Sequence, residues 1–409
     1  MVYALINRNH ILGIATALFS IFAYSIIKNK MVKVSSTSLS FNFVSKLAEI
    51  AQEKGAVNLS NDHSDFPCQP DLLNSLVWHL SEGRNKYAPG EGVLELRKVI
   101  SNYYNAKYSY YYNPESEITI TNGAIQGIFT ALTSLIGEGD EVIIFEPAFE
   151  TYVPSVEARG ARPIYFQLNP HDFSIDWNAL TKLINSKTKL IIINSPHNPT
   201  GKVLSKESFE HLQRIVNGTK IFILSDEAFG ELHFDGESDT SVACYPKLAE
   251  RSIIVGSLGK SLCVPGWKIG YCLAPENLME GFRHAHRYQV YSANLPIQLA
   301  LADYLTGKGN WFPYLNDFVY RRDLFRDLMK DSRFDLYPVD GGYFQIIGYQ
   351  NISQESDVDF SLRIAEEVGV SMLPLSLFYH DRVDNQKLRI CFGKSEDDLR
   401  LAAERLKVL

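Results

Sequence analysis

Cysteine is scarce in this sequence, and positive charge is not in surplus. The 409 residues include five cysteines, none spaced as C-x-x-C, namely Cys68, Cys244, Cys263, Cys272 and Cys391. This pattern indicates neither a zinc site nor a disulfide framework, so we expect no metal and a reducing compartment. A net charge of −7 without a basic stripe argues against a nucleic-acid partner. Sequence repeats and low-complexity linkers are also absent.

The beginning of the chain is unusually apolar. Residues 11–27 carry no formal charge and reach the lower limit of length for a membrane-spanning helix. Arg8 precedes them, and lysines follow within residues 28–33. If the segment inserts, these lysines would keep the rest of the chain in the cytoplasm, where we expect the protein with or without an anchor. Met31 offers a second explanation, a misassigned upstream start, and both explanations stay open.

Lys260 is the residue around which the rest of the chain is interpreted. It follows the apolar run Ile253–Val255, so it lies beyond the end of a buried strand, where open α/β sheets bind ligands. Lys268 follows a Pro-Gly turn that can fold the segment back. Two neighbouring ammonium groups disfavour each other's protonation, which suits an amine nucleophile. A P-loop would need glycine in place of Ile254, and the other segments of a penicillin-binding serine site are missing.

Other candidate binding residues also follow apolar strands. Gly123, Ala124 and Ile125 form a strand–turn–helix junction, where free backbone N–H groups bind anions. Asn198 lies in the turn Ser-Pro-His-Asn-Pro-Thr-Gly after one apolar strand, and Asp226 ends the next. This convergence at strand ends carries more weight than any single residue.

Arg389 belongs to a strand near the end of the chain. Leu388, Ile390 and Phe392 share one face of this strand, so Arg389 points the other way. A guanidinium there offers two parallel donors to a carboxylate. An exposed arginine at a sheet edge is the alternative.

The lysine segment resembles that of a known enzyme family. Ser257-x-Gly-Lys260 followed by Gly-Trp-Lys268-Ile-Gly is similar to class I pyridoxal-phosphate aminotransferases, in the branch of methionine and kynurenine aminotransferases. The resemblance runs from about Phe41 to the C-terminus. It implies pyridoxal 5'-phosphate as cofactor, amino-acid and 2-oxo-acid substrates, and a homodimer.

The resemblance also implies a role for each candidate residue. Lys260 would be catalytic and form the Schiff base. The cofactor phosphate would be held by Ser257, Lys268, Gly123, Ala124 and Ile125, and by Tyr87 of the neighbouring subunit. Phe149 would cover the pyridine ring, Asn198 would bind its oxygen, and Asp226 would pair with its nitrogen. Arg389 would hold the substrate carboxylate, with Asn198 and Asp62 completing the substrate site.

Two residues depart from the family pattern. Asp62 stands where relatives carry the second glycine of a Gly-Gln-Gly-Phe-Pro-Asp-like turn. Its carboxylate would repel the carboxylate of an amino acid unless it is paired. Phe229 replaces a tyrosine whose hydroxyl also binds the ring oxygen, which leaves Asn198 as the one assigned donor.

Strand, turn and helix signals alternate along the chain, which indicates an α/β fold with a mostly parallel sheet. The resemblance implies the aspartate aminotransferase-like fold of PLP-dependent transferases. We expect a large PLP-binding domain over residues 66–305 and a smaller α/β domain over 306–409. An N-terminal arm, 35–65, would join the small domain, and 1–34 would form the apolar extension.

The function expected is transfer of an amino group from an L-amino acid of methionine, aromatic or kynurenine type to a 2-oxo acid. Two alternatives stay open. One is a cysteine-conjugate-type carbon–sulfur β-lyase on the same fold, because the same carbanion can expel a β-substituent. The other is a membrane-tethered cofactor-binding protein with little turnover, which Asp62, Phe229 and the apolar N-terminus together motivate.

Overall fold

The computed structural model describes residues 38–234, 240–307 and 309–409. The apolar run 11–27 and the alternative start at Met31 lie outside the described residues. In the described ranges, no helix combines the length and the apolar character needed to cross a membrane.

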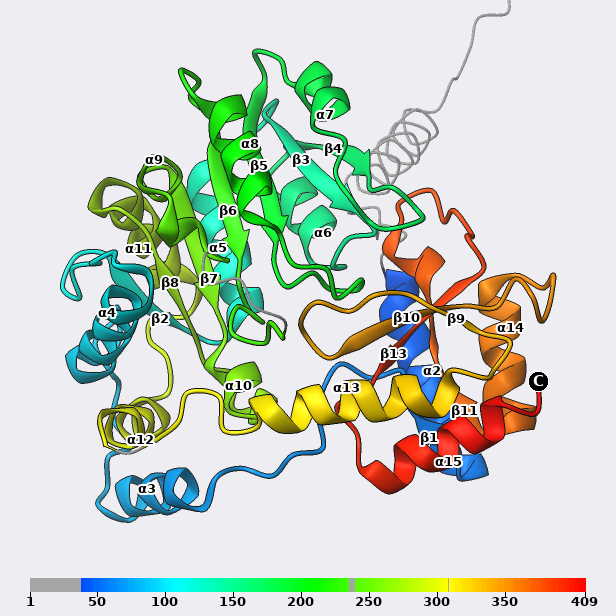
Figure 1. Ribbon diagram of the computed structural model, residues 1–409. Helices are drawn as coiled ribbons and strands as arrows, with labels where there is room; N and C mark the ends of the chain where they lie inside the picture. The colour runs from blue at the N-terminus through cyan, green and yellow to red at the C-terminus, as the bar shows by residue number, and fades with distance from the viewer. Residues whose placement is uncertain (1–37, 235–239, 308) are drawn as a thin grey trace, which may run out of the picture.

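A seven-stranded sheet forms the centre of the larger part of the molecule (Figure 1). Its strands are β2 (Ile118–Thr121), β3 (Glu141–Glu146), β4 (Arg162–Gln167), β5 (Thr188–Asn194), β6 (Phe222–Asp226), β7 (Ser252–Gly256) and β8 (Gly270–Leu273). The spatial order is β2-β8-β7-β6-β5-β3-β4. Only β8 runs antiparallel to its neighbours β2 and β7, while the other pairs are parallel. The predicted mostly parallel α/β sheet is therefore confirmed.

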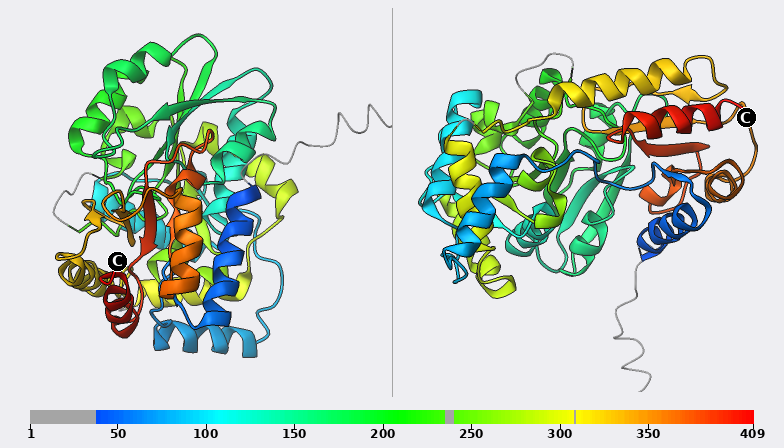
Figure 2. Two further views of the ribbon diagram at one scale, coloured as in Figure 1. Left: turned by 90° about the vertical axis from the view of Figure 1, so that its right-hand side faces the viewer. Right: turned by 90° about the horizontal axis from the view of Figure 1, so that it is seen from below.

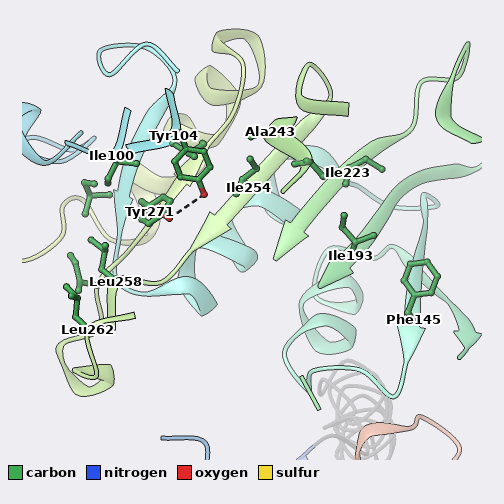
Figure 3. Packing of buried hydrophobic residues seen from close by; sticks show 14 of the residues in the cluster. Ile100, Tyr104, Phe145, Ile193, Ile223, Ala243, Ile254, Leu258, Leu262 and Tyr271 are labelled. Carbon is green, nitrogen blue, oxygen red and sulfur yellow. Dashed lines mark hydrogen bonds between the residues drawn. The ribbon is translucent and has the colours of Figure 1, made fainter. Parts of the chain in front are cut away.

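Helices cover both faces of this sheet because its strands are apolar on both sides. In β3, Val142 and Ile144 pack toward one face, and Ile143 and Phe145 toward the other. The first face is covered by α5 (Ala124–Leu135), α6 (Tyr152–Glu157) and α11 (Glu276–Gln289). The second face packs against α4 (Leu94–Tyr108), α7 (Trp177–Leu183) and α8 (Lys206–Val216). Figure 3 shows part of this second cluster.

Further helices extend the large part of the molecule. They are α3 (Pro70–Ser81), α9 (Pro246–Ala249), α10 (Leu258–Ser261) and α12 (Leu295–Thr306). The helix α12 packs on α4, and α3 packs on α12, so this helical layer lies at one side of the sheet (Figure 1).

A second group of elements lies beside the large sheet, as the two turned views in Figure 2 also show. Its strands are β1 (Val57–Asn58), β9 (Asp335–Leu336), β10 (Phe344–Gly348), β11 (Val370–Ser371), β12 (Leu373–Pro374) and β13 (Lys387–Cys391). Its helices are α2 (Ser38–Lys54), α13 (Leu315–Met329), α14 (Asp357–Arg363) and α15 (Glu396–Leu406). The order β12-β13-β10-β9 is antiparallel, and β1 pairs with β11. This pairing ties the N-terminal arm to the C-terminal third of the chain.

A substitution at Gly256 tests the packing of the strand that precedes Lys260. It is the last residue of β7 and pairs with Tyr271, and a Cβ atom on Gly256 would overlap the Tyr271 ring. Because this ring is buried against Tyr104, it cannot swing aside freely. We expect Gly256→Ala to lower the free energy of unfolding by about 1–3 kcal/mol, measured by urea denaturation.

Gly137→Ala is the matched control, since no atom lies within 4 Å of its added Cβ. This change should stay within about 0.5 kcal/mol of the unaltered protein. Equal losses in the two variants would contradict the packing argument.

Candidate active site

A cavity of about 210 Å³ opens where the strands of the large sheet end. Loops that follow β2, β3, β5, β6 and β7 all contribute to its wall, as expected at the carboxyl ends of parallel strands. The predicted site residues that line it are Asp62, Gly123, Ala124, Ile125, Phe149, Asn198, Asp226, Ser257, Lys260 and Lys268. The structure thus brings together residues that are far apart in sequence, from Asp62 to Lys268.

Lys260 points its amine into this cavity. Ser257 caps the short helix α10 by accepting a hydrogen bond from the Lys260 backbone N–H at 3.3 Å. The Nζ atom donates to the backbone oxygen of Asp62 at 2.5 Å and lies 3.0 Å from its Oδ2. The rings of Phe229 and Tyr343 each lie 5.7 Å from Nζ. The lysine is therefore held between a carboxylate and two aromatic rings.

The Asp62 carboxylate is paired with Lys260 in this structure, so its charge is not left without a partner beside the substrate site. Partial burial raises the pKa of its carboxyl group, but the charge and hydrogen bond of Lys260 and the charge of Arg389 outweigh burial and hold this pKa at about 2. Asp62 is therefore ionised throughout the neutral range. Its side chain is 58% exposed, on the cavity wall.

One end of the cavity is suited to an anion. The helix α5 begins there, its N-cap Gly123 has φ +82°, and no side chain caps its first N–H groups. Lys268, itself in the left-handed region at φ +51°, lies against Gly123, with Cε 3.6 Å from where a Cβ of Gly123 would be. A helix N-terminus and an ammonium group together favour a phosphate.

The wall of the same cavity holds a buried carboxylate, Asp226. Tyr152 donates to its Oδ2 at 2.6 Å and the backbone N–H of Ala228 to its Oδ1 at 3.1 Å. Burial raises the pKa of Asp226, although these hydrogen bonds lower it. Across the described ranges, no cationic side chain pairs with this carboxylate. A cationic ligand group would therefore be stabilised here.

Asn194 and Tyr152 support the cavity and were not predicted. The Asn194 side chain donates to the backbone oxygen of Asp226 at 2.9 Å and accepts from the Asn198 N–H at 2.8 Å. Tyr152 opens α6 three residues after Phe149, whose ring it contacts edge to face at 5.7 Å. Asn194 is the last residue of β5 and Tyr152 lies in the segment that follows β3, and these positions were the signal that could have identified them.

Arg389 is buried beside the cavity. It lies in β13, between β12 and β10, so the alternative of an exposed edge arginine is wrong. It donates from Nη1 to Asn198 Oδ1 and from Nη2 to the Ser60 carbonyl, both at 3.0 Å. Its buried Nε has no hydrogen-bond partner, and no carboxylate of the described residues forms an ion pair with it. A ligand carboxylate would satisfy this guanidinium.

The contact with Arg389 also orients Asn198. Because a guanidinium only donates, the atom it contacts must be the amide oxygen, and the amide NH₂ remains to face the cavity. Phe229 lines the same cavity and supplies no hydroxyl there, as the sequence indicated.

Tyr87 does not belong to this cavity. It is 82% exposed and contacts Tyr291 edge to face at 5.2 Å. Its predicted contact with a neighbouring subunit's phosphate stays a prediction.

The cavity suits a ligand with an anionic group, an aldehyde and a basic ring nitrogen. The open N-terminus of α5 with Lys268 fits the anion, the Lys260 amine fits the aldehyde, and the unpaired carboxylate of Asp226 fits the ring nitrogen. Pyridoxal phosphate has these groups. The fold and the cavity thus define a pyridoxal-phosphate enzyme with the aspartate aminotransferase fold.

Comparison with known proteins identifies the family. Residues 55–406 match the family described as aminotransferase class I and II. Methionine aminotransferase from Escherichia coli K12 is 36% identical over 89% of this chain and 95% of its own length. Kynurenine–oxoglutarate transaminase 1 from Mus musculus is 28% identical over 88% of this chain and 93% of its own.

A solved structure gives the same result. The crystal structure of YbdL from Escherichia coli, which its description links to a methionine aminotransferase function, superposes with a TM-score of 0.87. It is 36% identical, and the alignment covers 89% of this chain and 97% of that one. The chain belongs to the class I and II aminotransferases and is a pyridoxal-phosphate-dependent transaminase.

Tyr152 offers a test of the site around the Asp226 carboxylate. Tyr152→Phe removes a hydrogen bond to a buried charged group, worth about 1.5–3 kcal/mol, and raises the pKa of Asp226 further. We expect cofactor affinity to fall about 10- to 100-fold, measured by titrating the protein with pyridoxal phosphate and following absorbance.

Tyr349→Phe is the control for this test. It also removes a buried tyrosine hydroxyl, which donates to the Glu355 carbonyl at 2.9 Å away from the cavity. Cofactor affinity should not change. An equal loss in both variants would mean that Tyr152 acts through general stability.

Proposed function

We propose that Lys260 binds the cofactor covalently and carries the catalytic proton. The observation that carries this proposal is the position of its amine in a single cavity with Lys268 and Asp226. The phosphate would be held by Ser257, Lys268 and the backbone of residues 123–125. These groups surround the uncapped start of α5, which supports the assignment.

Phe149 would cover the cofactor ring, Asp226 would pair with its nitrogen, and the Asn198 amide would donate to its oxygen. Bound pyridoxal phosphate supplies an electron sink for the bond broken at the substrate Cα. Asp226 would keep the ring nitrogen protonated. In the described chain no cationic side chain pairs with this carboxylate, which supports the assignment. Tyr152 and Asn194 would hold Asp226 in place.

Arg389 would bind the substrate α-carboxylate. Its partnerless Nε and its contact with Asn198 support this role, because the carboxylate would complete its hydrogen bonds beside the cavity. Lys260, once its amine is released, would take the proton from Cα and return it to the cofactor side as general base and then acid. The rings of Phe229 and Tyr343 beside Nζ would limit access of water to this step.

The amino donor would be an L-amino acid of methionine, aromatic or kynurenine type. The names of the methionine and kynurenine relatives support this class. The family membership favours transamination over the carbon–sulfur lyase and over a binding protein with little turnover.

A substrate panel tests this proposal. Methionine, kynurenine, phenylalanine and glutamine would be assayed against several 2-oxo acids, with both products measured. Amino-acid product formed only when an oxo acid is added supports a transaminase. Ammonia and pyruvate from a cysteine conjugate without added oxo acid would identify a lyase instead.

Lys260→Ala tests the covalent assignment. We expect the visible absorbance of the bound cofactor and the activity to disappear, because Lys260 is the lysine whose amine we propose to bond to the cofactor carbonyl. Lys189→Ala, whose side chain lies over Phe222, is the control and should keep both. Borohydride trapping of cofactor on the Lys260→Ala protein would refute the assignment.

We propose the two predicted domains, 66–305 and 306–409, with the arm 35–65 joining the smaller one. The pairing of β1 with β11 and the shared core of Val57, Leu59 and the C-terminal strands support this division. A homodimer is also proposed. The exposed apolar side chains of α3, Leu73, Val77 and Trp78, support it, as does the exposed Tyr87.

The N-terminal extension 1–34 is proposed to be dispensable for catalysis, with the catalytic part in the cytoplasm. Removal of residues 1–30 should leave cofactor affinity within about twofold, because the cavity is lined by residues from Asp62 onward. Loss of cofactor binding on truncation would contradict this. Fractionation of cells that express the full chain would tell a membrane anchor from a misassigned start.

A further inference from the structure

Asp62 places a fixed negative charge where the substrate must bind. Its carboxylate lines the cavity and is 58% exposed to it and to solvent. Its partner is Lys260, at 3.0 Å. With the cofactor bound as proposed, the Lys260 nitrogen would be committed to it and would no longer offer three ammonium hydrogens. While the substrate binds, the Asp62 carboxylate would then attract or repel the charged groups of the substrate.

The loop that carries Asp62 is held rigidly beside the carboxylate site. The Asp62 carbonyl accepts from the Tyr343 hydroxyl at 2.7 Å as well as from Lys260. Two residues earlier, the Ser60 carbonyl accepts from Arg389 Nη2 at 3.0 Å. The guanidinium that would bind the α-carboxylate and the charge of Asp62 therefore belong to one hydrogen-bonded unit. The backbone of Asp62 therefore cannot move away from the cavity without breaking the contacts of its loop with Tyr343 and Arg389.

The charges of the cavity leave no partner for a second substrate carboxylate. In the described part of the chain, the cations at or beside it are Lys260, Lys268 and Arg389, and the proposed function uses all three. Glu150 adds a further negative charge that acts on Arg389. A dicarboxylate would bring its second charge into a region where the fixed charges that the proposed function does not use, including that of Asp62, are negative.

We propose that Asp62 determines substrate class by excluding dicarboxylates, so that both the amino donor and the 2-oxo-acid acceptor carry a single carboxylate. This inference rests on the proposed function of the same cavity. Like charges brought together in a binding site weaken binding strongly. The unaltered enzyme should therefore prefer 2-oxopentanoate over 2-oxoglutarate, which have the same chain length, by about 10- to 100-fold in kcat/KM.

The test removes the charge and keeps the shape. In Asp62→Asn holoenzyme, the preference for 2-oxopentanoate should shrink at least about tenfold. The ratio of two acids on one protein cancels any effect of the change on Lys260 itself. Asp323→Asn is the matched control, because Asp323 is 56% exposed and also contacts a cation, Arg322, but lies outside the cavity. Its preference should equal that of the unaltered enzyme.

A binding measurement separates this inference from the proposed function. Pentanoate and glutarate do not react, and their affinities for the holoenzyme can be measured by calorimetry. Tighter binding of pentanoate that is lost in Asp62→Asn supports the inference even if no substrate of the panel is transaminated. An unaltered enzyme that binds glutarate as well as pentanoate, or an undiminished preference in Asp62→Asn, would overturn it even if transamination is observed.

Discussion

The parallel arrangement of β3, β5, β6 and β7 is the constraint on which the rest of the structure depends. Each of these strands is apolar on both faces, so helices must cover both sides. The helical connections between successive strands bring each strand back in the same direction. The loops that leave the strands therefore gather at one edge of the sheet. Phe149 and Asn198 lie on these loops, Asp226 ends β6, and Lys260 lies in the short helix α10 after β7, and for this reason they share one cavity.

Two buried charges explain why this cavity suits its cofactor and substrate. Asp226 has hydrogen-bond donors, and Arg389 has hydrogen-bond acceptors, but neither has a partner of opposite charge at ion-pair distance in the described ranges. An isolated buried charge is costly. A ring cation at one and a carboxylate at the other would lower this cost, so ligand binding and electrostatic relief occur together.

The departures from the family pattern affect the part of the cavity around Lys260. Asp62 and Phe229 both contact this lysine, the first by an ion pair and the second through its ring. The hydrogen bonds of Asp226 come from Tyr152 and Ala228 and not from these two residues. We interpret Asp62 as a residue that affects substrate specificity within the chemistry of the family.

Much of the fold and of the site could be predicted from sequence. Apolar strands, glycine turns and the lysine segment are local patterns, so they indicated the α/β sheet correctly and pointed to residues that the structure brings into one cavity. The alternation in β13 likewise determined which way Arg389 points. The partner of Asp62, the support of Asp226 by Tyr152 and Asn194, and the orientation of the Asn198 amide depend on contacts between distant segments. Only the tertiary structure decided these, because no local pattern records which side chains meet across the cavity.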